Sequence, residues 1–86
     1  MSLLIEKTLF MNISDVKEKL LAGEELVAEV MRNPADLTEW LIWIREPSGK
    51  SFMLSNDDGI LIKSTDTTPF FHMLKSLGFR QAAVIF

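Results

Sequence analysis

Few residues of this chain are of types that take part in catalysis. His72 is the single histidine, and histidine is the side chain that most often exchanges a proton near neutral pH. There is no cysteine to act as a nucleophile, and no serine lies in the setting of a nucleophile elbow. The glutamates at positions 24, 25, 29 and 39 are not placed by their spacing in one cleft. We therefore predict a surface or boundary position for His72, no catalytic residue and no enzyme activity.

Two short motifs match ligand-binding loops only in part. The Gly-Lys-Ser sequence at residues 49–51 occurs in phosphate-binding loops, but their leading glycine would fall at Ile44 and a helix would have to follow. Residues 56–59, Asn-Asp-Asp-Gly, lack the alternating spacing and the distal glutamate of a calcium loop. Both are typical of hairpin turns. We predict no metal site and no cofactor.

The aromatic residues allow one further chemistry, the stacking of nucleic-acid bases on a sheet. Trp43 would be the stacking residue, and Lys50, Lys63 and Arg80 would contact phosphates. The net charge of −3 argues against this interpretation, because non-specific nucleic-acid binding comes from an excess of Lys and Arg. Nucleic-acid binding is therefore kept as the alternative function.

The stretch that must position all other elements is residues 38–46, with five consecutive apolar residues between two proline-containing turns. Its β-branched and aromatic residues are typical of a strand. Alternation places Trp40, Ile42 and Ile44 on one face and Leu41 and Trp43 on the other. A strand with two apolar faces is predicted to be central in a sheet.

Five further stretches are predicted strands: residues 3–10, 24–32, 51–55, 60–63 and 81–86. Residues 24–32 also have good helix propensity, and a strand is preferred because Gly23 would disfavour a continuous helix. The stretches 38–46, 51–55 and 60–63 are predicted to form a meander. The last stretch is apolar on both faces, so we predict an inner strand.

The first helix is predicted to begin after Asn12 or Ser14, either of which can cap it, and to stop at Gly23. In the alternative with Asn12 as the cap, Met11 packs on Val16.

The second helix is predicted to begin with a threonine hydroxyl cap at residues 67–68, followed by Pro69 at the first helical position. Gly78 ends it, and Phe79 falls where a Schellman motif places its apolar contact with Leu74. The predicted buried stripe consists of Phe70, Met73, Leu74 and Leu77.

Length and composition fit one domain over residues 1–86. The predicted fold is α+β, with a mainly antiparallel five- or six-stranded sheet, two short helices on one face and the order β-α-β-β-β-β-α-β. No apolar run approaches the roughly 18 residues of a membrane span, and Glu6 and Lys7 interrupt any signal-peptide pattern. We expect a cytoplasmic protein, of bacterial or phage origin.

Two helices of this length cover one face of the sheet, and the second apolar face also needs cover. A homodimer that packs sheet on sheet, or shares an edge, would supply it; the alternative is a monomer wrapped by its helices and N-terminal strand. The sequence therefore predicts a small non-enzymatic accessory or regulatory protein that acts through protein-protein contacts and self-associates through its sheet. The candidate interface residues are Leu41, Trp43, Met53 and Leu61.

Overall fold

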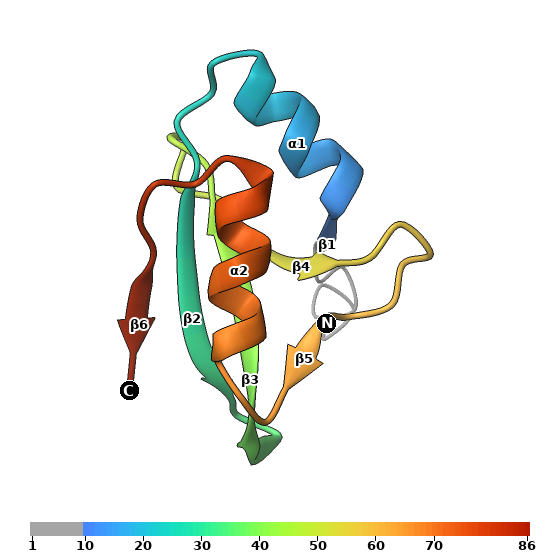
Figure 1. Cartoon of the computed structure of the whole chain (residues 1–86), viewed down its shortest axis with the longest axis vertical. Coiled ribbons are helices and arrows are strands. Elements are labelled where there is room, and N and C mark those ends of the chain that lie inside the picture. Colours follow the sequence, from blue (N-terminus) through green and yellow to red (C-terminus); the bar gives the residue numbers. More distant parts are fainter. Residues whose placement is uncertain (1–9) are drawn as a thin grey trace, which may run out of the picture.

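The computed structural model describes residues 10–86, which form an α+β domain with a six-stranded mixed sheet and two helices (Figure 1). The predicted element order and fold class are confirmed. Of the predicted strand 3–10, residues 3–9 lie outside the described part, and Phe10 begins the first strand. The elements are β1 (Phe10–Asn12), α1 (Ile13–Leu21), β2 (Val27–Asn33), β3 (Asp36–Arg45), β4 (Ser51–Ser55), β5 (Lys63–Ser64), α2 (Thr68–Leu77) and β6 (Ala83–Ile85).

The central strand is β3, as its two apolar faces predicted. The sheet has the order β1-β4-β3-β2-β6, and β3 pairs antiparallel with β2, β4 and β5. The two outer pairs, β1 with β4 and β2 with β6, are parallel. The ambiguous segment before β3 is a strand, because β2 pairs with β3 along its whole length.

The predicted meander is wrong at its third strand. Of the predicted strand 60–63, one isolated bridge joins Leu61 to Ser55 at the end of β4. The strand β5 pairs with Trp40 and Leu41 of β3. The strand β3 is twice as long as β4, 10 residues against 5, so its first half has a free edge. The other edge of β4 is already paired with β1 over residues 53–55, so β5 pairs where β3 has an open edge.

The position predicted for the last strand is also wrong. β6 is an edge strand that pairs with β2 on one side, and no other strand within residues 10–86 pairs with its second side. Apolar residues on both faces of a strand predict cover above and below it. They do not determine which strands lie beside it, because backbone groups form those pairs.

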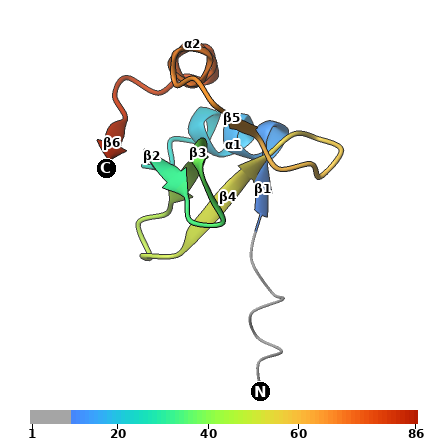
Figure 2. The same ribbon diagram turned by 90° about the horizontal axis from the view of Figure 1, so that it is seen from below.

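The main core lies between the sheet and the two helices, which both lie on the same face (Figure 2). The strand β3 contributes Trp40, Ile42 and Ile44 to this core, as its alternation predicted. The other buried apolar residues of the core are Met11, Val16, Leu26, Ala28, Val30, Leu54, Phe70, Leu74, Leu77 and Phe79. Leu41 and Trp43 therefore point to the opposite face.

The first helix begins and ends as predicted with Asn12 as its cap. The side-chain oxygen of Asn12 accepts a hydrogen bond from the backbone N–H of Asp15 at 2.8 Å. A second acceptor comes from the β4–β5 connection, where the Asp57 carboxylate receives the backbone N–H and the hydroxyl of Ser14 at 3.0 and 2.6 Å. The helix ends before Gly23, whose φ of 87° is favourable for glycine.

The second helix differs from prediction at its start. Thr67 is the N-cap residue but its hydroxyl makes no capping bond. The carboxylate of Asp66 instead accepts the backbone N–H of Thr68 at 3.0 Å. The end is as predicted, because Gly78 is left-handed and the N–H of Phe79 donates to the carbonyl of Leu74 at 3.0 Å. Three residues of the predicted stripe are buried, and Met73 is partly buried.

Candidate interface on the open face of the sheet

The face of the sheet opposite the helices carries a continuous row of side chains, which we call the central row of the open face. In register across the strands it consists of Phe10 of β1, Met53 of β4, Trp43 of β3, Glu29 of β2 and Ala83 of β6. Directly opposed residues lie about 5 Å apart and contact each other. Three large apolar side chains, those of Phe10, Met53 and Trp43, are therefore neighbours on this face.

A second row on the open face runs beside the first. It consists of Lys63 of β5, Leu41 of β3, Met31 of β2 and Ile85 of β6. Leu61 reaches the same face through its bridge to Ser55, which lies two residues after Met53. The fold thus brings all four predicted interface residues to one face of the sheet.

Exposure divides these four residues into two groups. Leu41 is 2% exposed, so it is already buried within the chain and has little surface left for a partner. Trp43, Met53 and Leu61 are partly exposed. The contact surface of the open face therefore centres on Trp43 and Met53. Leu41, in the neighbouring row, adds little to it because it is buried.

Several residues that were not among the predicted interface residues enlarge this surface. Phe10 is 47% exposed, Val27 44% and Ile85 42%, and Met31 is partly exposed. The alternation of Val27 and Met31 within β2 is visible in the sequence. Their gathering on one surface depends on which strands pair, and in which register, so the sequence does not reveal it.

The charged groups on the open face form ion pairs. The carboxylate of Glu29 accepts a hydrogen bond from the guanidinium of Arg45 at 2.7 Å, with the Glu29 side chain 12% exposed. Lys63 lies 3.7 Å from the carboxylate of Glu39. Charges that are already paired need less compensation when a partner removes water, so both pairs are compatible with an interface.

The three residues predicted to contact phosphates are not brought together. Lys63 lies opposite Leu41, near one end of the paired region of β3, and forms the ion pair with Glu39. Lys50 lies in the turn beyond the other end of β3, next to the pair of Arg45 and Ser51. Arg80 lies in the connection from α2 to β6, on the helix side. The arrangement gives a nucleic acid no common basic track with Trp43, and its binding stays a prediction.

The two motif-like loops are hairpin turns, as predicted. In the first, the N–H of Glu46 donates to the carbonyl of Lys50 at 2.8 Å, and Gly49 closes the turn. In the second, the N–H of Asn56 donates to the carbonyl of Ile60 at 2.8 Å, and its side chain accepts the N–H of Asp58. Their polar groups are thus engaged in holding the chain reversal.

Two carboxylates have a lowered pKa, and in both cases the main cause is a pair of hydrogen bonds from one neighbouring residue. His72 is exposed on α2. Hydrogen bonds from the hydroxyl and then the N–H of Thr38 lower the pKa of Asp36, and the same two groups of Ser14 lower the pKa of Asp57. Within residues 10–86, no group of three or more His, Asp or Glu side chains is placed to hold a metal ion.

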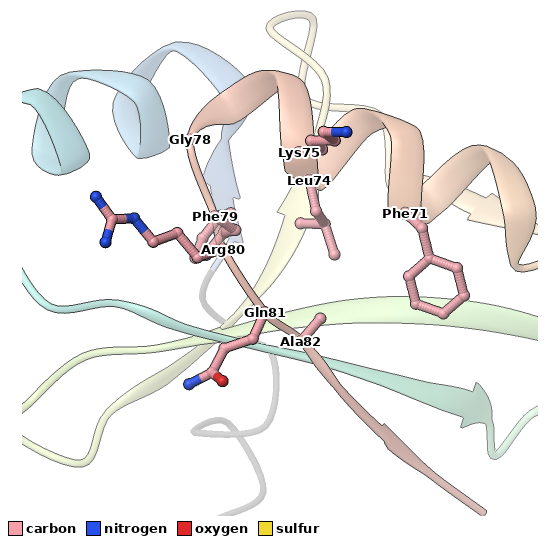
Figure 3. Close-up of a pocket in the computed structure, with 8 residues that line it drawn as sticks. All are labelled: Phe71, Leu74, Lys75, Gly78, Phe79, Arg80, Gln81 and Ala82. Atoms are coloured by element: carbon pink, nitrogen blue, oxygen red, sulfur yellow. The ribbon is translucent and has the colours of Figure 1, made fainter.

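A second surface lies on the helix side of the molecule, next to β6. It is a groove of about 660 Å³ bounded by α2 and by the connection that leads to β6 (Figure 3). We call it the α2–β6 groove. Its lining residues are Phe71, Leu74, Lys75, Gly78, Phe79, Arg80, Gln81 and Ala82. No sequence pattern predicts this groove, because it forms where the chain turns from α2 into an edge strand.

Comparison with known proteins found no matching family model, no matching curated protein and no matching solved structure. Among the described residues, neither helix has the length and apolar character required to cross a membrane.

Proposed function

We propose that this protein is a small non-enzymatic accessory protein of the cytoplasm that acts through protein-protein contacts and associates with a second copy through the open face. The observation that carries the proposal is the central row, in which Trp43 lies between Met53 and the Glu29–Arg45 ion pair, on the face opposite α1 and α2. Large aromatic residues surrounded by apolar contacts and paired charges are typical of interface centres.

Self-association is favoured by the composition of this face. A two-fold contact places the same surface on both sides, so apolar side chains such as Trp43 and Met53 meet apolar side chains. The charges next to them are already neutralised within each copy, which removes the repulsion that like charges would otherwise cause. Several exposed apolar residues would be covered together, among them Phe10 and Ile85.

The deciding experiment replaces Trp43 by glutamate and measures mass by light scattering during size exclusion. Wild type is expected as a dimer and Trp43→Glu as a monomer. Loss of a central aromatic contact weakens binding by about 30-fold or more, or about 2 kcal/mol. The ratio of absorbance at 260 and 280 nm, measured on protein taken directly from cells, reports any bound nucleic acid.

Two further variants separate the interface from general damage to the fold. Phe10→Glu, on an exposed edge-strand residue of the same row, is expected to weaken the dimer as well. Leu21→Glu introduces the same charge at a residue 86% exposed at the end of α1, on the helix side, and is expected to remain dimeric. A wild-type monomer, or a Trp43→Glu variant that keeps the dimer mass, would refute the proposed interface. Bound nucleic acid would favour the alternative function.

A further inference from the structure

The outer edge of β6 lacks most of the features by which proteins protect sheet edges. Residues 81–86, which include β6, contain no charged side chain and no proline. An edge strand exposes backbone N–H and C=O groups that can pair with another chain, and charges, prolines or bulges normally prevent this. Among the described residues, shortness is the one protective feature of β6, because three residues form a weak ladder alone. A stable contact there requires additional side-chain packing.

The α2–β6 groove offers that packing directly beside the edge. Figure 3 shows Leu74 and Phe71 extending from α2 toward the connection that carries Ala82. Leu74 and Phe79 are buried, whereas Phe71 is 40% exposed. The groove thus has an apolar floor and an exposed aromatic wall, with the polar side chains of Lys75, Arg80 and Gln81 also in its lining, and it lies on the helix side of β6.

The side chains of β6 that face the groove follow from alternation. Val84 pairs with Val30, a residue of the main core, so Val84 is on the helix side of the sheet. Ala82 and Phe86 are two residues away from Val84 in either direction, and an extended chain places them on that same side. Phe86 is 95% exposed, and its ring meets Trp40 edge-on at 6.1 Å between centroids.

We propose that a second copy of this chain pairs its β6 antiparallel with β6, around a two-fold axis at Val84. This register pairs all three residues of each β6, with Ala83 opposite the second copy's Ile85. Continued by two residues, it places Phe86 of each copy opposite Ala82 of the other, on the helix side. To enter the α2–β6 groove of the other copy, the exposed Phe86 ring of each copy leaves its edge-on contact with Trp40 and turns toward the β6 edge.

The symmetry makes the contact self-complementary. Each copy supplies one groove and one Phe86, so two identical contacts form around the axis. The uncharged edge lets the two strands approach without electrostatic repulsion. The two-fold axis is perpendicular to the sheet, so both open faces lie on the same side of a continuous sheet. The contact is separate from the open-face contact proposed above and does not depend on it. It is the weaker of the two, because each β6 has only three residues, so it dissociates at the dilution of size exclusion and the mass measured there reports the open face.

Cysteine cross-linking tests the register, because the chain has no native cysteine. A Val84→Cys variant has its thiol opposite the same thiol of the second copy, at the short Cα separation that a disulfide requires. With copper phenanthroline as oxidant, it is expected to form a covalent dimer about tenfold faster than Leu21→Cys, whose position is more exposed but outside the contact.

Ile85→Cys is the control for register. It lies on the other face, and its equivalent in the second copy is a diagonal neighbour at roughly 7–8 Å, beyond easy bridging. It is expected to cross-link slowly although Ile85 is 42% exposed. Equal rates for Val84→Cys and Leu21→Cys would overturn the proposed contact, and faster linking through Ile85→Cys would overturn its register.

Two additional variants separate this inference from the open-face proposal. Adding Phe86→Ala to Val84→Cys is expected to slow cross-linking toward the rate of Leu21→Cys, because the groove loses its occupant. Adding Trp43→Glu is expected to leave the Val84→Cys rate unchanged. Cross-linking that persists with Phe86→Ala would contradict the role of the groove, and cross-linking lost with Trp43→Glu would contradict the independence of the two contacts.

Discussion

At the scale of single residues, the contact between Asp57 and Ser14 fixes the start of α1 to a distant turn. The carboxylate of Asp57 accepts two hydrogen bonds from Ser14, at 3.0 Å from the backbone N–H and 2.6 Å from the hydroxyl. The first turn of a helix has unpaired N–H groups and a positive dipole end, so a negative acceptor is favourable there. The Asn12 cap is local and was predictable, whereas Asp57 lies 43 residues away from Ser14 in the chain.

The Asp57→Asn variant is expected to lower the melting temperature at neutral pH. The hydroxyl and then the N–H of Ser14 lower the pKa of Asp57 below the usual 3.8; burial opposes this in part, and the charge of Lys17 makes the smallest contribution. A carboxylate with a lowered pKa in the folded state stabilises above its unfolded value, and that contribution is lost as pH falls through the folded pKa. Thermal melts of both proteins from pH 7 to pH 2 measure the difference.

The difference between Asp57→Asn and wild type should therefore be largest above about pH 4 and should shrink below it. Asp58→Asn, at the next position of the same turn, removes the same charge without removing the contact to Ser14. A melting temperature lowered equally by both variants would show that the charge of the turn matters and the contact with Ser14 does not.

At the scale of elements, a local signal determines where α2 ends. The chain that follows leads to β6, which pairs with β2, a strand far away in the sequence. Gly78 ends the helix with a φ of 113°, and the Phe79 N–H closes the motif on Leu74. This turn directs the chain from the helix into the connection to β6, and it places Phe79 in the core. The start of α2 was less predictable, because the N–H of Phe70 donates to the Thr67 carbonyl rather than to the Thr67 hydroxyl, and Asp66 accepts the N–H of Thr68.

Gly78→Ala is expected to destabilise the fold by about 1 kcal/mol or more. The nearest atom to an added Cβ is a Leu20 side-chain carbon at 3.7 Å, an ordinary contact, so the cost comes from the left-handed backbone. Chemical denaturation measures the free energy of unfolding. His72→Ala, at an exposed position within the same helix, is the control and is expected to change it by less than about 0.5 kcal/mol. A cost for Gly78→Ala no larger than the control would contradict the backbone explanation.

At the scale of the whole molecule, stability rests on one core between the sheet and the two helices. Ile42 is at the middle of β3, is fully buried, and lies between β2 and the half of the sheet that contains β4 and β5. Both helices of the described part of the chain lie on the first face, so both proposed contacts involve the sheet. The helix face therefore supports folding, and the open face and the β6 edge are available for association.

Ile42→Ala is expected to lower the free energy of unfolding by roughly 2–5 kcal/mol, the range for deleting a large buried aliphatic side chain. That is a large share of the roughly 5–15 kcal/mol that stabilises a typical domain. Urea denaturation of Ile42→Ala in the Trp43→Glu background, compared with Trp43→Glu alone, measures the effect without a contribution from association. Ile60→Ala, at a residue 63% exposed in the β4–β5 connection, should change stability by less than about 0.5 kcal/mol. Similar losses for both variants would refute this placement of the core.

The sequence by itself determined the features that depend on neighbouring residues. Alternation in residues 38–46 set the two faces of β3, and Gly23, Gly78 and the two hairpin turns set where elements stop. The reason is that strand alternation, helix caps and positive φ angles arise from contacts within a few residues along the chain.

Tertiary structure alone decided which distant segments meet. It placed β6 at an edge, paired β5 with β3, brought Asp57 to Ser14 and left the α2–β6 groove beside an unprotected strand. It also buried Leu41 while leaving Trp43 and Met53 partly exposed. These outcomes depend on competition between backbone edges and apolar faces far apart in the chain, and any apolar strand can satisfy the same local pattern with several different neighbours.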